Sequence, residues 1–242
     1  MTEVNWRFTQ KNIRLNKIIA LLPPSVVNEW TPHFEHVELK QGQVLYAPGG
    51  VLRHLYFPLT AIVSWVRILE NGATTKVAMV GREGVVGLYL LLGAVQTLNC
   101  AMVQKAGSAI RLQLGDVLTH FNHGDEVQKI FLRYTQTLFN QMAQGSVCHR
   151  HHALEQQLCC MLLFTLDRQD SNTIALTHER LANLLGVRRE GVTQAAHRLM
   201  QQNAIRYSRG NITVLNRQAL EEQSCECYNV INDEYQRFLS AA

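Results

Sequence analysis

The chain has 242 residues, of which 47% are hydrophobic and 17% are charged. This composition excludes a disordered or fibrous protein, and the length fits one large domain or two domains of ordinary size. Twenty-three basic and nineteen acidic residues give a formal net charge of +4. A total this small does not indicate a nucleic-acid partner, so the distribution of charge along the chain has to be considered.

Neither of two candidate targeting or membrane segments has the required pattern. The apolar run at residues 18–22 is too short for the core of a signal peptide. Residues 84–103 carry no formal charge, but Gly84, Gly87 and Gly93 interrupt them, which is typical of strands and turns. We therefore expect a soluble, cytoplasmic protein without a membrane partner.

The first half of the chain predicts short helices followed by strands. Residues 13–34 have helical patterns, and Pro23-Pro24 is expected to open the second of two helices. From about residue 34 to residue 114, short runs rich in Val, Ile, Tyr and Trp alternate with glycine. Residues 63–80 predict a hairpin closed at Asn71-Gly72. This segment is therefore interpreted as an all-β module of the sandwich, jelly-roll or barrel type.

A long helix of about 25 residues is predicted next. Its apolar side chains recur at spacings of three and four residues and form one stripe, which consists of Val127, Ile130, Phe131, Tyr134, Leu138 and Met142. A stripe on a helix between two modules must be covered, either by a second copy of the chain or by the β-module. We assign it to dimerisation, with packing against the β-module as the alternative.

Positive charge is concentrated beyond this helix. All six lysines lie in the first 129 residues, whereas residues 153–217 contain eight arginines and five acidic residues, a formal +3. Arginine presents a planar fork of donors that suits phosphates and guanine edges. A solvated surface is the alternative interpretation of this segment.

Residues 177–202 have the pattern of a helix-turn-helix. Thr177 is expected to cap a first helix that ends at Leu185, Gly186 to form the turn, and a second helix to follow from about Arg188 to Gln202. Small Ala182 allows the two helices to cross closely. The side chains predicted to pack between the two helices are Leu181, Leu185, Val187, Val192 and Ala195.

Residues 203–215 alternate apolar and polar side chains around Arg209-Gly210, which predicts a β-hairpin and hence a winged helix. The outward side chains of the second helix are types that bond to base edges, and those of the hairpin can reach phosphates. The predicted DNA-binding residues are Arg188, Arg189, Glu190, Thr193, Gln194 and His197, together with Thr177, Arg206 and Arg209.

This order of elements resembles the CRP/FNR family of bacterial transcription regulators over about residues 15–217. The resemblance is most specific at residues 176–215 and at Lys40 to Leu45. It implies an α+β fold with an N-terminal jelly-roll β-roll, a long dimerisation helix and a C-terminal winged helix-turn-helix. The expected segments are a cyclic-nucleotide-binding-like sensory domain (1–121), a dimerisation helix (122–152), a DNA-binding domain (153–218) and a helical tail (219–242).

The chain departs from two branches of that family. The segment that resembles the ribose-binding Gly-Glu-Leu of the cyclic-AMP binders has Leu88 in place of the acid, and Asn99-Cys100 replaces the later pair of arginine and a hydroxyl residue. The iron–sulfur branch has an N-terminal cysteine cluster, but the first cysteine here is Cys100. Both kinds of sensing are therefore disfavoured, and Gln194 at a later arginine position implies a different operator.

The cysteines and histidines form two further groups. Cys148, His149 and His152 suggest a metal or haem site, because on a helix His152 would share a face with His149 and with Cys148, but solvated or backbone-bonded histidines are the favoured interpretation. Cys225 and Cys227 point to nearly opposite faces of a helix, whereas in a loop they would allow redox sensing. The six cysteines show no disulfide framework and are expected to be reduced. We assign no metal, no cofactor and no catalytic residue, and hence no enzymatic activity.

The sequence therefore predicts a homodimeric, sequence-specific transcriptional regulator that binds double-stranded DNA and has RNA polymerase as a further partner. It is expected to sense an unidentified signal through its β-roll. Two-fold symmetry predicts a palindromic operator whose half-sites lie about 34 Å apart. The alternative is a ligand-sensing or thiol-redox-sensing module that acts mainly through protein contacts.

Overall fold

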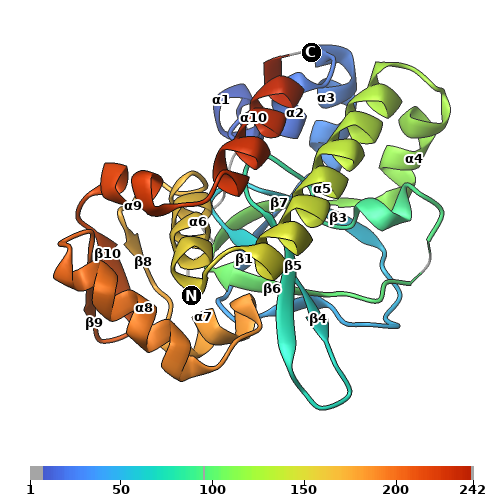
Figure 1. Ribbon diagram of the computed structural model, residues 1–242. Helices are drawn as coiled ribbons and strands as arrows, with labels where there is room; N and C mark the ends of the chain where they lie inside the picture. Colours follow the sequence, from blue (N-terminus) through green and yellow to red (C-terminus); the bar gives the residue numbers. More distant parts are fainter. Residues whose placement is uncertain (1–7, 95, 241–242) are drawn as a thin grey trace, which may run out of the picture. The chain divides into compact units, whose positions relative to one another are not determined.

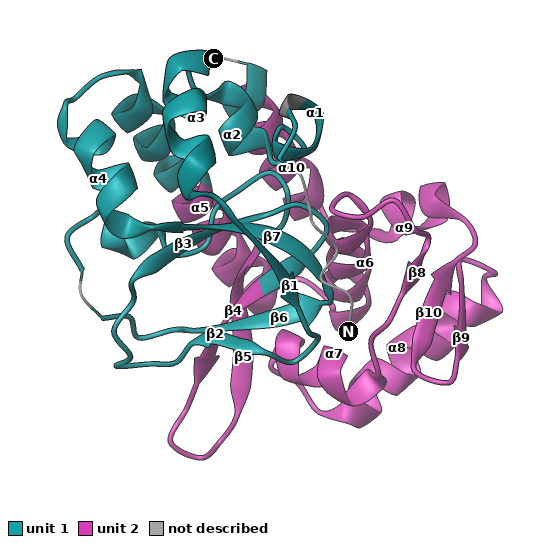
Figure 2. Ribbon diagram, turned by 180° about the vertical axis from the view of Figure 1, so that it is seen from behind, with its two compact units in different colours: residues 1–63, 80–137, 238–242 teal, residues 64–79, 138–237 magenta. Residues whose placement is uncertain are grey.

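The computed structural model describes residues 8–94 and 96–240 and divides into two compact units, which Figure 2 colours separately. The first unit consists of residues 1–63, 80–137 and 238–242, and the second of residues 64–79 and 138–237. The outer ends of the first and last predicted segments, residues 1–7 and 241–242, lie outside the described residues.

Short helices begin the first unit. Asn16 caps α2 with its side chain, and Pro24 occupies the first position of α3, as the Pro23-Pro24 pair predicted. Ile18, Ile19, Val27 and Trp30 are buried. The helical elements of this unit are α1 (Gln10–Ile13), α2 (Lys17–Leu21), α3 (Pro24–Trp30), η1 (Thr31–His33), η2 (Leu88–Leu90) and α4 (Leu114–Asn122).

The strands of the first unit form the predicted β-rich module (Figure 1). They pair antiparallel in a three-stranded sheet of order β1-β7-β3, and β2 pairs antiparallel with β6. Phe57 is opposite Ile110 in this sheet and both are fully buried, so one face of the sheet forms core. The strands are β1 (Glu35–Leu39), β2 (Val44–Tyr46), β3 (His54–Pro58), β6 (Cys100–Lys105) and β7 (Gly107–Gln113).

The second unit contains most of two strands that form the predicted hairpin, β4 (Ile62–Ile68) and β5 (Thr74–Val80). The amide of Leu69 donates to the carbonyl of Ala73, and Gly72 has a φ of +81°, which closes the turn. The remaining elements, apart from the long helix α5, are α6 (Leu154–Leu166), β8 (Thr173–Ile174), α7 (His178–Leu185), α8 (Arg189–Gln201), β9 (Ile205–Ser208), β10 (Asn211–Val214), α9 (Arg217–Gln223) and α10 (Cys227–Ser240).

The long helix α5 (Glu126–His151) has 26 residues, and residues 126–137 of it belong to the first unit. Figure 1 shows it as one continuous ribbon. The mixed fold class, the long helix and the C-terminal helix-turn-helix are therefore as predicted. None of the helices in the described part of the chain combines the length and the apolar character that crossing a membrane requires.

The apolar stripe assigned to dimerisation is buried within the chain itself, which corrects that assignment. Phe131 packs edge-on against Phe121 with ring centroids 6.3 Å apart, and Tyr134 lies 5.8 Å from the ring of Phe238, all within the first unit. Five of the six stripe residues are at most 2% exposed, and Met142 is half-buried: Val127, Ile130, Phe131, Tyr134 and Leu138 are the five. The core of the same chain, rather than a second copy, covers this face.

A second apolar stripe on α5 is exposed. Leu132, Phe139 and Val147 are exposed by 47%, 58% and 47%, large fractions for side chains of this kind. Gln136 and Ala143 lie between them and are also exposed, so the spacing along the stripe is four, three, four and four residues. This spacing gives one continuous surface, which we call the exposed α5 stripe.

Asn16 joins three backbone segments of the first unit. Its side-chain oxygen accepts a hydrogen bond from the amide of Ile19 at 3.2 Å and so caps α2. Its side-chain nitrogen donates to the carbonyls of Pro58 and Gly84 at 3.0 and 2.9 Å. The residue is fully buried, so its removal leaves these backbone groups without water to replace it.

We expect Asn16→Ala to lower the free energy of unfolding by about 2–4 kcal/mol, because a lost helix cap costs about 1 kcal/mol and unsatisfied buried carbonyls add about 1–3 kcal/mol. Urea denaturation measures this change. Asn122→Ala, at an exposed asparagine of the same unit, is the matched control and should change stability by less than about 0.5 kcal/mol. Equal stabilities of the two variants would contradict the role given to Asn16.

Candidate nucleic-acid interface

The first helix of the predicted helix-turn-helix is α7, and both of its ends have the expected signals. The hydroxyl of Thr177 accepts a hydrogen bond from the amide of Arg180 at 3.2 Å, which caps the helix. Gly186 follows the last residue with a φ of +69°, and the next amide, of Val187, donates to the carbonyl of Ala182 at 3.0 Å. The turn is therefore formed as the sequence predicted.

Close packing holds α7 against the second helix, α8. Leu181, Leu185 and Val192 are buried between the helices, and Val187 is partly buried beside them. Ala182 and Ala195 are also buried, and their small side chains allow the backbones to approach. Since the apolar side chains of α8 are used in this contact, its opposite face is left to polar residues.

Gly186 is also close to the β4–β5 hairpin of the same unit. A Cβ atom built on it would lie 2.3 Å from the hydroxyl oxygen of Thr75, and the hydroxyl of Thr74 donates to the carbonyl of Asn183 at 3.1 Å. Both the left-handed backbone and this close approach therefore require glycine at position 186.

The outward face of α8 is polar and accessible. All six predicted base-reading residues are exposed: Arg188, Arg189, Glu190, Thr193, Gln194 and His197. Among the residues that the structure describes, the guanidinium groups of Arg188 and Arg189 have no hydrogen-bond or ion-pair partner. These donors are therefore available to a ligand outside the chain.

Thr193 differs from its neighbours because its hydroxyl is engaged. It donates to the carbonyl of Arg189 at 3.0 Å, and its oxygen lies 3.1 Å from Nδ1 of His178. The His178 ring stacks on Tyr207 of the hairpin, with centroids 4.0 Å apart and planes at 25°. Burial, followed by the nearby charge of Arg189, lowers the pKa of His178, so a neutral ring that donates from Nδ1 fits this site.

His178 therefore connects the start of α7, the outward face of α8 and the hairpin. This role cannot be predicted from the sequence, because a buried histidine directly after a helix cap has no distinguishing pattern. A further residue that was not among the predicted contacts is Arg180, an exposed arginine of α7 whose guanidinium has no partner within the described residues. The available signal was its position three residues after the helix cap Thr177, in the first turn of α7.

The hairpin that follows α8 is the predicted wing, and Figure 1 shows β9 and β10 next to each other beyond the end of α8. The strands form a three-stranded sheet of order β8-β10-β9. Arg209 and Gly210 both have positive φ, +48° and +79°, as a two-residue type I′ turn requires. Arg206 and Arg209 are exposed, and their guanidinium groups have no partner in the part of the chain that is described.

Other arginines of this segment are used inside the protein. Arg198 pairs with Glu155 at 2.9 Å, and Arg217 bonds to Asp167 and Glu221, each at 2.7 Å. Arg168 donates to the carbonyl of Phe164. The eight arginines thus fall into three with internal partners and five with free guanidinium groups in the described structure, namely Arg180, Arg188, Arg189, Arg206 and Arg209.

The positions that resemble the cyclic-nucleotide contacts lie in the first unit and are engaged with the protein. Leu88 and Cys100 are buried. The side-chain nitrogen of Asn99 donates to the hydroxyl of Tyr89 at 2.7 Å. Burial raises the pKa of the Tyr89 hydroxyl, so this group stays neutral. Apolar and neutral groups therefore occupy these positions.

Comparison with known proteins identifies the C-terminal part of the chain by sequence and most of the chain by fold. Residues 156–223 match the Crp-like helix-turn-helix domain. No curated protein gives a match. Among solved structures, a transcriptional regulator of the CRP/FNR family from Eubacterium rectale ATCC 33656 is similar with a TM-score of 0.67 and 16% identity, over 84% of this chain and 94% of that one.

Two further structures have the same fold. FixK2 from Bradyrhizobium japonicum has a TM-score of 0.66 and 16% identity, over 79% of this chain and 98% of that chain. TTHA1359 from Thermus thermophilus, a transcriptional regulator of the CRP/FNR family, has a TM-score of 0.63 and 21% identity, over 78% of this chain and 98% of that chain. Residues 156–223 therefore form a Crp-like helix-turn-helix domain, and most of the chain shares its fold with these solved regulators.

Proposed function

We propose that the protein is a sequence-specific DNA-binding regulator that acts as a homodimer on a palindromic operator. The observation that carries this proposal is the outward face of α8, where exposed side chains that suit base edges have no internal partner. A helix with this character in a Crp-like helix-turn-helix domain fits the major groove. Regulation of transcription implies RNA polymerase as the protein partner.

Base reading is assigned to the first half of α8. Arg188 and Arg189 can each bond to O6 and N7 of guanine, and Glu190 can accept from N4 of cytosine. Gln194 can bond to adenine, and His197 lies one turn further along the same exposed face. The hydroxyl of Thr193 contacts the carbonyl of Arg189 and the ring of His178, so we give Thr193 a positioning role.

Backbone contacts are assigned to the start of α7 and to the wing. The hydroxyl of Thr177 accepts from the helix, so its own proton remains free to be donated to a phosphate oxygen. Arg180 lies one turn into the same helix, and Arg206 and Arg209 extend the positive surface along the hairpin. These contacts would set the register on the duplex without reading its sequence.

Dimerisation is assigned to the exposed α5 stripe, in place of the buried stripe. Leu132, Phe139 and Val147 are exposed apolar side chains at spacings that suit pairing of two parallel helices. A two-fold pair of helices brings the same residues of the two chains together. It would also give the operator its palindromic symmetry.

Substitution of two arginines separates base reading from backbone contact. We expect Arg189→Ala to weaken binding to the preferred duplex by about 1–3 kcal/mol and to relax selection at one base pair. Arg209→Ala should instead weaken binding to all DNA sequences alike. It should also reduce by about 1 the slope of log affinity against log salt concentration. Selection from a random duplex pool, followed by titrations at several salt concentrations, measures both effects.

Arg53→Ala removes the same charge from an exposed position of the first unit and is the control. An unchanged sequence preference in Arg189→Ala would refute the base-reading assignment. Binding that does not depend on salt, or that selects no palindrome, would instead favour the alternative of a sensory module that acts through protein contacts.

Phe139→Glu should separate the dimer into monomers. A buried aromatic residue contributes about 2 kcal/mol or more to the free energy of binding at an interface. Because a symmetric dimer contains the change twice, we expect dimerisation to be weaker by about 4 kcal/mol. Sedimentation equilibrium measures the dissociation constant, and Val51→Glu, at another exposed apolar residue, is the control. A Phe139→Glu variant as dimeric as the control would show that the stripe is not the interface.

A further inference from the structure

Four potential metal ligands of the second unit converge on one point. They are Cys148 and His152 of α5, and Cys225 and Cys227 near the start of α10. One ligand atom from each lies within 4.8 Å of the others. The sulfur atoms of Cys148 and Cys225 are 3.5 Å apart, and the sulfur of Cys227 is 3.4 Å from Nδ1 of His152.

The local backbone explains why these residues meet. Cys148 and His152 are four residues apart at the end of α5, so they lie on the same face. Cys225 lies in the turn between α9 and α10, and α10 begins only at Cys227. In one helix, which the sequence pattern favours, the two cysteines would diverge. The turn removes that restriction, and we therefore revise the assignment of no metal.

The surroundings of the cluster resemble the outer shell of a metal site. Nε2 of His152 lies 3.3 Å from a carboxylate oxygen of Glu226, while Nδ1 faces the sulfur of Cys227. Such a carboxylate holds a ligating histidine in the required tautomer. The side-chain amide of Gln144 donates to the sulfur of Cys227 at 3.1 Å, as hydrogen-bond donors do to metal-bound sulfur atoms.

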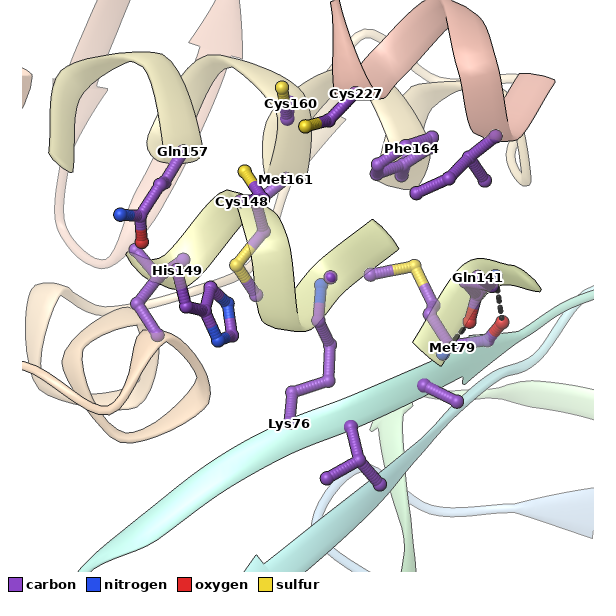
Figure 3. Close-up of a pocket in the computed structure, with 15 residues that line it drawn as sticks. Lys76, Met79, Gln141, Cys148, His149, Gln157, Cys160, Met161, Phe164 and Cys227 are labelled. Carbon is purple, nitrogen blue, oxygen red and sulfur yellow. Dashed lines mark hydrogen bonds between the residues drawn. The ribbon is translucent and has the colours of Figure 1, made fainter. Parts of the chain in front are cut away.

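The cluster is closed to solvent on most sides and has a cation beside it. Cys148, Cys225 and Cys227 are buried, and His152 is half-buried. Cys148 and Cys227 also line a pocket together with Lys76 and Cys160 (Figure 3). Three thiolates and a divalent cation have a net charge of −1, which the ammonium group of Lys76 can balance.

We propose that Cys148, His152, Cys225 and Cys227 bind one structural zinc ion per chain. Three sulfur donors and one imidazole nitrogen are a usual tetrahedral set for zinc, and a buried set of four leaves no open position for catalysis. The ion would join the end of α5 to the segment that follows the helix-turn-helix domain, within the second unit. This proposal does not depend on the DNA contacts assigned above.

A disulfide is the competing chemistry for these thiols. The sulfur of Cys225 lies 3.5 Å from that of Cys148 and 3.4 Å from that of Cys160, so either pair could be oxidised. A disulfide needs only two of these groups. It gives no role to His152, to its carboxylate partner Glu226 or to the hydrogen bond that the Gln144 side chain donates to Cys227, whereas a metal site uses all three.

The test begins with the unmodified full-length chain. Zinc analysis after purification under reducing conditions should give about one ion per chain. After removal of zinc, titration with Co²⁺ should produce visible ligand-field bands of a tetrahedral site and a thiolate-to-cobalt charge-transfer band with the intensity of three thiolates. Absence of both signals, or a Cys225 disulfide found by mass spectrometry in place of zinc, would overturn the proposal.

Variants identify the ligands. Cys225→Ser and Cys227→Ser should abolish stoichiometric zinc binding, and Glu226→Gln should weaken it by about 10–100-fold, as loss of an outer-shell carboxylate does. Cys159→Ser, at a buried cysteine of α6 outside the ligand set, is the matched control and should retain the ion. Zinc binding unchanged in Cys225→Ser and Cys227→Ser would refute the site.

Cys160→Ser and His152→Gln decide between the four proposed ligands and a set of four cysteines. We expect the first variant to keep the three-thiolate cobalt spectrum and the second to lose it. The opposite result would refute His152 as a ligand. Should a variant fail to fold, the charge-transfer intensity of the unmodified chain still counts the thiolates, and thermal denaturation with and without a chelator should show a lower melting temperature for the zinc-free chain.

Discussion

The close approach of α7 and α8 is the contact on which the rest of the candidate nucleic-acid interface depends. Ala182 and Ala195 allow it by their small size, and Gly186 allows it by its left-handed backbone and by the space that it leaves for Thr75. Once the apolar side of α8 is committed to this contact, its polar side has to face outward. The accessibility of Arg189 and of its neighbours follows from this packing.

Internal pairing determines which arginines are available, and net charge alone does not reveal it. The formal excess of positive charge in residues 153–217 is small. Arg217 lies in a network with Asp167, Glu221 and Tyr228 that stabilises the domain. Free guanidinium groups occur at the start of α7, on α8 and on the wing. Under the function proposed above, discrimination between DNA sequences would therefore depend on a few positioned side chains rather than on a strong general attraction to DNA.

Local signals were sufficient to predict the helix-turn-helix and the wing. Thr177, Gly186 and the Arg209-Gly210 pair each specify a cap or a turn through their own backbone preferences, so no knowledge of distant residues was needed. The two apolar stripes of α5 show the limit of this approach. Periodicity identifies an apolar face, but only tertiary packing decides whether residues such as Tyr134 or Phe139 are covered. Asn16 and the cluster around Cys225 likewise depend on contacts across more than 40 residues.

The turn of the wing also restricts which amino acids position 209 can hold. Arg209 has a left-handed backbone, which costs a non-glycine residue roughly 1 kcal/mol or more. Glycine or asparagine would relieve this strain but would remove the cation from the tip of the hairpin. With the phosphate contact proposed for Arg209, stability and function would therefore place opposite requirements on this position.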